Sequence, residues 1–240
     1  MKNLVGILTL LLIHVSLYGN DTLVHQKGLK VMSKSGLKLR LSPSTDAPVL
    51  DIIDYGEEVF QTEDFVSSRQ EIFVNWVEGS WIKVQYQNQE GFVFDGFVSE
   101  LVVPSQADEL ASSIEDLGYA MYNYVWNHFE FKGMDTLAQT NNSMTTNTKM
   151  GRHTLFMHET PSLTQLELTF EDVRIMDVYH LLESMMDTRS ARSRLKENTI
   201  FFQGGDGKVN KLKIGDGQIL LKKLDSTHIK VSIKTLHQGC

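Results

Sequence analysis

Short runs of alternating hydrophobic and polar residues, separated by turn residues, fill the first part of the chain from Gly28 to about Val103. Leucine alternates with a basic residue from Leu37 to Leu41, which is the pattern of a strand with one buried face. Several short strands with such punctuation predict a small β-barrel or sandwich. The other predicted strands are Val49–Ile53, Val59–Phe60, Trp81–Tyr86 and Phe92–Phe94.

A barrel of this size buries a small core and must use nearly every apolar side chain in it. The predicted core residues are Leu37, Leu39, Val49, Ile52, Val59, Ile82, Val84 and Val93. Arg40 is expected to hold the barrel together through a carboxylate or a carbonyl group.

The second part of the chain mixes helical and strand patterns. Ser105 and Asp108 form a capping box, and helical spacing after it predicts a helix from about Gln106 to Phe129. The polar stretch Thr136–Lys149 is expected to be a loop. Asp177 is a candidate N-cap for a second helix, in which Val178, Leu181, Leu182 and Met185 share one face.

A β-hairpin is expected over Thr154–Met157 and Leu163–Phe170, and four strands with glycine- or aspartate-containing turns follow the second helix. The predicted architecture is an α+β domain with an antiparallel sheet, over residues 105–240. The four later strands are Thr199–Gln203, Lys208–Ile214, Gln218–Leu224 and His228–Leu236.

The first part resembles a bacterial SH3 domain. Members of that family open with Gly-Leu-Asn-Val-Arg-x-x-Pro, place a tryptophan in a Trp-x-x-Val strand and close with Gly-aromatic-Val. The resemblance implies an SH3-like β-barrel over residues 21–103 and a role in binding peptide, glycan or protein. It rests on Gly36, Leu37, Leu39, Arg40, Pro43, Gly56, Trp81, Val84, Gly91, Phe92 and Val93, with Lys38 where asparagine is usual.

A core this small does not need all the aromatic residues of the first part, so some are expected to remain at the surface and to contact a ligand. The residues considered are Tyr55, Phe60, Trp76, Trp81, Tyr86, Phe92, Phe94 and Phe97. Trp76 and Tyr55 are the two expected to lie outside the core. Packing in the core, or against the second domain, is the alternative for the others. The candidate ligand-binding residues are Tyr55, Trp76, Trp81, Phe92 and Phe94.

The N-terminus predicts export. Residues 1–20 combine Lys2 with an apolar run too short for a comfortable membrane span, as a signal peptide does. We therefore expect a periplasmic or secreted protein, with an uncleaved anchor as the alternative. The single cysteine, Cys240, is the last residue, so the chain has no internal disulfide.

Charge and spacing narrow the possible chemistry. The net charge is −7, and 13 acidic against 7 basic residues lie between Asp21 and Pro104, which disfavours nucleic acid as a partner. The cluster Arg189, Arg192, Arg194 and Lys196 is interpreted as a solvated helix end, because cations suit helix C-termini.

Catalytic and metal sites find little support in the sequence. Cys240 has no histidine after it, as a papain-like enzyme requires. His153 and His158-Glu159 are the only metal-site candidates. The two histidines are five residues apart, so they point in different directions on a strand and also on a helix. We therefore name no catalytic residue, metal ligand or cofactor.

The sequence thus predicts a non-catalytic adaptor that binds cell-wall peptide, glycan or an envelope protein. Two alternatives stay open. One is a cell-envelope hydrolase whose active site lies in the second domain. The other is a structural protein in which the aromatic residues of the first domain are buried between two rigidly packed domains.

Overall fold

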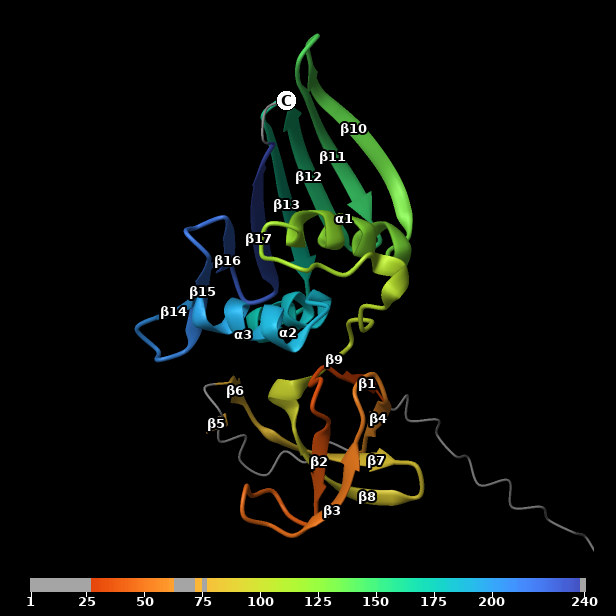
Figure 1. The fold of residues 1–240 in the computed structure, drawn as a ribbon. Coiled ribbons are helices and arrows are strands. Elements are labelled where there is room, and N and C mark those ends of the chain that lie inside the picture. The colour runs from red at the N-terminus through yellow and green to blue at the C-terminus, as the bar shows by residue number, and fades with distance from the viewer. Residues whose placement is uncertain (1–26, 63–71, 75–76, 238–240) are drawn as a thin grey trace, which may run out of the picture.

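The computed structural model describes residues 27–62, 72–74 and 77–237 and consists mostly of β-strands. We refer to residues 27–103 as the N-terminal region and to residues 104–237 as the C-terminal region. Figure 1 shows the two regions one below the other, with helices of the C-terminal region facing the N-terminal one.

The N-terminal region is built on a seven-stranded sheet with the strand order β3-β2-β8-β7-β4-β1-β9, beside which β5 and β6 form a separate pair. A short 3-10 helix, η1 (Asp95–Phe97), precedes the last strand. The strands are β1 (Gly28–Val31), β2 (Leu37–Arg40), β3 (Val49–Ile53), β4 (Glu58–Gln61), β5 (Ile72–Val74), β6 (Val77–Gly79), β7 (Trp81–Tyr86), β8 (Gln89–Phe94) and β9 (Val98–Ser99).

The core of this sheet confirms most of the predicted residues and corrects two. Leu39 and Val84 are fully buried, whereas Val49 is 44% exposed and Ile52 is 55% exposed. Both exposed residues lie in β3, which is an edge strand paired only with β2. Leu41 follows the end of β2 and is also exposed. The predicted role of Arg40 is confirmed, because its Nη1 donates to the carbonyl oxygen of Ala47 at 2.6 Å.

The C-terminal region is an eight-stranded antiparallel sheet in the order β10-β11-β12-β13-β17-β16-β15-β14. In chain order, one helix precedes the first four strands, and two helices precede the last four. The last strands of the two groups, β13 and β17, pair with each other at the centre of the sheet. The elements are η2 (Gln106–Asp108), α1 (Leu117–His128), β10 (Phe131–Gln139), β11 (Met144–Met150), β12 (His153–Thr160), β13 (Leu163–Glu171), α2 (Ile175–Met185), α3 (Arg189–Glu197), β14 (Thr199–Gln203), β15 (Val209–Ile214), β16 (Ile219–Lys223) and β17 (His228–Leu236).

Strand predictions succeeded here except at the polar stretch Thr136–Lys149. The β12–β13 hairpin and the last four strands are confirmed, but the expected loop is wrong, because most of this stretch lies in the hairpin of β10 and β11. Threonine is β-branched and suits a pleated strand, so a threonine-rich polar stretch satisfies β-structure as well as a loop.

Two helix predictions need correction. The Ser105–Asp108 capping box is present, but it caps only η2, and Glu109 then adopts a left-handed conformation (φ 52°) that ends the turn. The helix expected from Gln106 therefore begins at Leu117. In α2 the N-cap is Arg174, and Asp177 is the third helical residue of a capping box instead of the N-cap.

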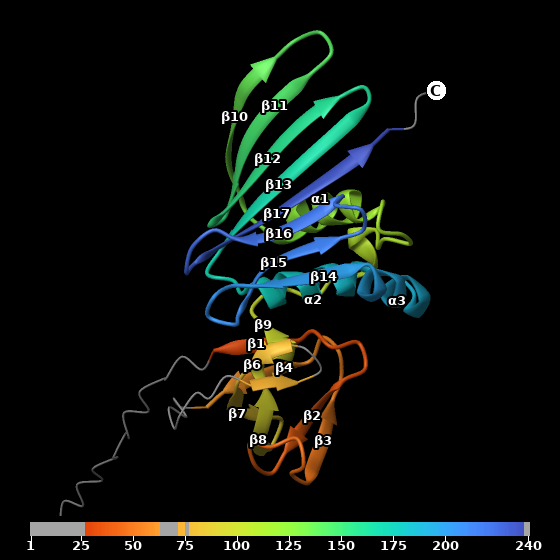
Figure 2. The ribbon, with the colours of Figure 1, turned by 90° about the vertical axis from the view of Figure 1, so that its left-hand side faces the viewer.

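The larger of the two hydrophobic cores joins both regions. It contains the predicted face of α2 together with the inner residues of the C-terminal sheet, and it also takes in Met32, Val77, Phe94 and Leu101 from the N-terminal region. Figure 2 shows α2 between the C-terminal strands and the N-terminal region. As a result α2 is buried on both sides, and His180 contacts the ring of Phe97 at 5.3 Å between ring centroids.

Candidate functional site

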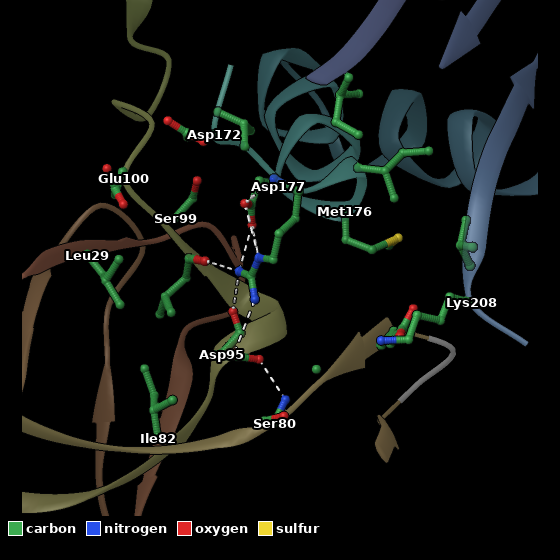
Figure 3. A pocket seen from close by; sticks show the side chains of 18 of the residues that line it. Leu29, Ser80, Ile82, Asp95, Ser99, Glu100, Asp172, Met176, Asp177 and Lys208 are labelled. Atoms are coloured by element: carbon green, nitrogen blue, oxygen red, sulfur yellow. Dashed lines mark hydrogen bonds and ion pairs between the residues drawn. The ribbon is translucent and has the colours of Figure 1, made fainter. Parts of the chain in front are cut away.

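A cleft of about 460 Å³ lies where the two regions meet. Its N-terminal side comes from β1, β6, β7, η1 and β9, and its C-terminal side from the β13–α2 connection, β15 and the β16–β17 turn. Figure 3 shows side chains from both regions pointing into this space. The cleft therefore exists only because the two regions pack against each other.

Arg174 lines the cleft and connects its two sides. Its Nη2 donates to the carbonyl oxygens of Asp95 (2.8 Å) and Val98 (2.9 Å), both in the N-terminal region. The same group donates to Oδ1 of Asp177 at 2.7 Å, and Nη1 lies 3.2 Å from Oδ2 of Asp95. A guanidinium group has a planar fork of donors that suits such multiple contacts. Arg174 thus fastens the start of α2 to the N-terminal region.

The carboxylates of Asp177 and Asp95 are each held in place by backbone groups of their own region. Asp177 belongs to the capping box of α2 and also accepts from the backbone N–H of Arg174 at 3.0 Å. Asp95 opens η1, and its Oδ1 accepts from the backbone N–H of Ser80 at 2.7 Å. Both carboxylates are therefore engaged in holding the junction.

The rim of the cleft carries charges of both signs. Lys27 forms an ion pair with Glu100, and the Lys208 ammonium lies 3.8 Å from a Glu78 carboxylate oxygen. Lys223 at the end of β16 also lines the cleft. The floor between these charges is apolar and includes Leu29, Ile82, Val98, Val173, Ile175 and Met176. Such a lining suits a ligand that has both ammonium and carboxylate groups beside apolar parts.

The resemblance noted in the sequence has a physical basis in the N-terminal sheet. Gly36 has φ +81° in the turn before β2, a conformation that favours glycine. A Cβ at Gly91 would lie 2.8 Å from Cδ1 of Leu39, so only glycine fits where β8 passes β2. Residues 35–99 match the bacterial SH3 domain family. No match was found among curated proteins or among solved structures.

Of the predicted ligand-binding residues, the four that the structure describes, Tyr55, Trp81, Phe92 and Phe94, do not line the cleft. Phe94 is 2% exposed and packs against Trp81 at 5.9 Å between ring centroids. Tyr55 is half-buried at the junction, where Nζ of Lys34 lies 3.7 Å from the centroid of its ring. Phe92 is half-buried in β8, and Trp76 lies outside the described residues. A binding role for these residues stays a prediction.

The two histidines considered as metal ligands have other surroundings. His153 is buried against Phe129 and Phe170, and its Nδ1 accepts from the backbone N–H of Glu171 at 3.2 Å. Burial, with a smaller contribution from Arg152, lowers the pKa of His153 to about 4. Nδ1 of His158 lies 2.8 Å from Oγ1 of Thr145. Within residues 27–62, 72–74 and 77–237, no group of three or more histidine, cysteine, aspartate or glutamate residues is arranged to hold a metal ion.

Sequence reasoning missed Arg174 and Asp95, which organise the junction. An arginine three residues before Asp177 was visible as a possible pair at a helix start, but nothing in the order of residues connected it to Asp95, which is 79 positions away. In the described part of the chain, none of the helices combines the length and hydrophobicity needed to cross a membrane.

Proposed function

We propose that this protein is an exported, non-catalytic binding protein of the bacterial cell envelope, and that the junction cleft binds the peptide part of the cell wall. The SH3 domain and an α+β domain formed by the C-terminal region would share one ligand. The observation that carries the proposal is the cleft itself, whose apolar floor lies between lysine and carboxylate groups from both regions.

The chemistry of the rim supports peptide over the other two ligand classes that the sequence allows, glycan and protein. Cell-wall peptides carry free carboxylates and free amino groups, whereas the glycan strand lacks free amino groups where they are acetylated. Lys223 suits a carboxylate of the peptide. The exposed ion pair of Lys27 and Glu100 also lies at the rim, where an ammonium group of the peptide would replace Lys27 as the partner of Glu100. An aromatic platform, which glycan stacking would favour, is absent from the described lining of the cleft.

The geometry of Arg174 supports binding over catalysis. A general acid and base pair needs two carboxylates that are available to a substrate. Asp95 and Asp177 both line the cleft, but each binds Arg174 and a backbone N–H. The hydrolase that remains the alternative would need its catalytic groups elsewhere in the chain.

Sedimentation of the purified protein with peptidoglycan sacculi tests the proposal. We expect the wild type to sediment with intact sacculi and to stay in solution with sacculi from which an amidase has removed the peptides. Lys223→Glu reverses one charge at the rim and is expected to weaken binding at least fivefold. Retention on peptide-free sacculi would contradict the peptide assignment in favour of the glycan.

Lys222→Glu is a matched control. Lys222 is next to Lys223 in β16, so its side chain points to the opposite face of the sheet, away from the cleft. Equal loss of binding in both variants would indicate a nonspecific effect of charge. Absence of sedimentation in the wild type would overturn the proposal and direct the search to a protein partner.

A further inference from the structure

In the eight-stranded sheet of the C-terminal region, β10 and β14 are the edge strands, and each pairs on one side only among residues 27–62, 72–74 and 77–237. An edge strand presents unpaired N–H and C=O groups that can pair with another chain. Folded proteins usually protect such edges with charged residues, proline or bulges. The two edges of this sheet differ in how far they are protected.

Strand β10 carries several of these protective features. Its pairing with β11 is interrupted twice, between Phe131 and Gly133 and between Thr136 and Ala138. Gly133 has φ +152°, and the strand contains the charged residues Lys132 and Asp135. Irregular backbone and charge together make this edge a poor template for another strand.

Strand β14 lacks charge along its whole length, which reads Thr-Ile-Phe-Phe-Gln. Ile200 is 53% exposed, Phe201 37% and Phe202 40%. The only interruption of its pairing with β15 comes at the end, between Phe202 and Gln203. An uncharged and largely regular edge strand with three exposed apolar side chains is suited to pair with a strand of another chain. If it were left unpaired, it would favour aggregation.

The faces of β14 suit a second copy of itself. Phe202 lies on the same face as Lys211, whose ammonium is 4.9 Å from the ring centroid, and Ile200 shares that face. Phe201 lies on the other face, where its ring contacts Tyr179 at 5.4 Å between centroids. A two-fold axis perpendicular to the sheet at Phe201 keeps each face continuous, because opposite residues in an antiparallel pair point the same way.

In this register each Ile200 lies opposite Phe202 of the other copy, and the two Phe201 side chains lie opposite each other. A β-branched residue opposite an aromatic one is a stabilising cross-strand pair, and no charged residue of β14 opposes another. Thr199 then lies opposite Gln203. The strand is therefore complementary to itself in shape, polarity and charge.

We propose that β14 pairs with β14 of a second copy of this chain, which joins two eight-stranded sheets into one. The contact is centred on five residues per chain, so its area is smaller than that of a stable obligate dimer. We therefore expect a reversible dimer with a dissociation constant on the order of 10–100 μM.

Sedimentation velocity from about 1 to 500 μM protein, with a reducing agent present to prevent disulfides through Cys240, measures the association. The wild type is expected to shift from monomer to dimer across this range. Ile200→Lys places a charge opposite Phe202 of the other copy and should weaken the dimer at least tenfold. Leu137→Lys is the control, because Leu137 is similarly exposed (58%) but lies in the opposite edge strand β10.

Hydrogen exchange of the backbone amides of residues 199–203 provides a measurement that needs no variant. Protection that rises with protein concentration supports the dimer. Protection that does not change with concentration would show that the edge is covered in another way or left unpaired, and would overturn the proposal. A wild type that stays monomeric at 500 μM, or a dimer lost on Leu137→Lys and kept on Ile200→Lys, would overturn it as well.

Discussion

The SH3 domain and the C-terminal region obtain their stability in different ways. The SH3 domain has a small interior of its own around Leu39, Val59 and Val84. The N-terminal region as a whole also contributes Met32, Val77, Phe94 and Leu101 to the larger core that fills the C-terminal region. The C-terminal region contributes no residue to the small core. A small barrel thus gains burial by placing its surplus apolar side chains in the core of its neighbour.

Titratable groups differ between the regions as well. The sequence from Lys27 to Val103 contains no histidine, whereas the C-terminal region buries His153, whose pKa is lowered by this burial. The SH3 domain is acidic, and its charges lie mostly at the surface. We therefore expect mild acid to act first on the C-terminal region.

Truncation of Phe94 should have the largest effect. Phe94→Ala removes a 2% exposed ring that contacts both Trp81 and Phe97, and such a change typically costs about 3–5 kcal/mol. Hydrogen exchange should speed up both in the SH3 domain and in α2, because the ring belongs to the shared core. Leu39→Ala should speed up exchange in the SH3 domain alone.

A control for this comparison comes from β3. Ile52→Ala changes an apolar residue of the SH3 domain that is 55% exposed, and it should alter the free energy of unfolding by less than about 0.5 kcal/mol. If Phe94→Ala affected only the SH3 domain, the shared core would not couple the two regions.

The pH dependence of unfolding should be set in part by His153. Its folded pKa of about 4 is below the ordinary value of 6.5, so the unfolded chain binds a proton more readily than the folded one between these values. The contribution of neutral His153 to the free energy of unfolding is therefore fully present above pH 6.5. It falls as the pH drops toward 4, and the loss is about 2 kcal/mol at pH 4.5. Urea unfolding at pH 7.5 and 4.5 measures this loss.

His153→Asn keeps an acceptor for the backbone N–H of Glu171 and cannot take up the proton. We expect this variant to be less stable than the wild type at pH 7.5 and to lose about 2 kcal/mol less on acidification. The same acid sensitivity in variant and wild type would assign the effect to another group.

Loss of the Arg174 contact should have the smallest effect of the three. Arg174→Gln removes the ion pairs with Asp95 and Asp177 and the hydrogen bonds to two carbonyl oxygens of the N-terminal region. The arginine side chain is 45% exposed, so solvent screens much of the interaction and we expect a loss of about 1 kcal/mol. The double variant with Asp95→Asn should cost less than the sum of the two single changes. Strict additivity would show that the pair does not couple the regions.

Prediction from sequence was most successful where a pattern repeats over short distances. Three such features were predicted correctly: the alternation around Leu39, the buried face of α2, and the hairpin turns after α3. They could be predicted because the periods of strands and helices depend on neighbouring residues. The stretch Thr136–Lys149 failed because polar, threonine-rich residues fit both a loop and an edge hairpin. Only the pairing of β11 with β12 distinguishes the two.

The candidate cleft could not be predicted from local sequence patterns. Its lining comes from segments that are far apart in the chain, and Arg174 meets Asp95 only after both regions have folded. The aromatic residues show the same limit. Their number predicted a surplus over the needs of a small core, but their order did not reveal that Phe94 would enter the core of the other region.

The order of residues was enough to predict the SH3 domain, through glycines that no other residue can replace without strain or a clash, and through the alternating strands around them. It was also enough to predict most of the later strands and α2. Three features arise only when the whole chain has folded: α2 is buried on two sides, the two regions share a core, and β14 remains as an apolar edge. These features depend on contacts between distant segments, which local periodicity does not encode.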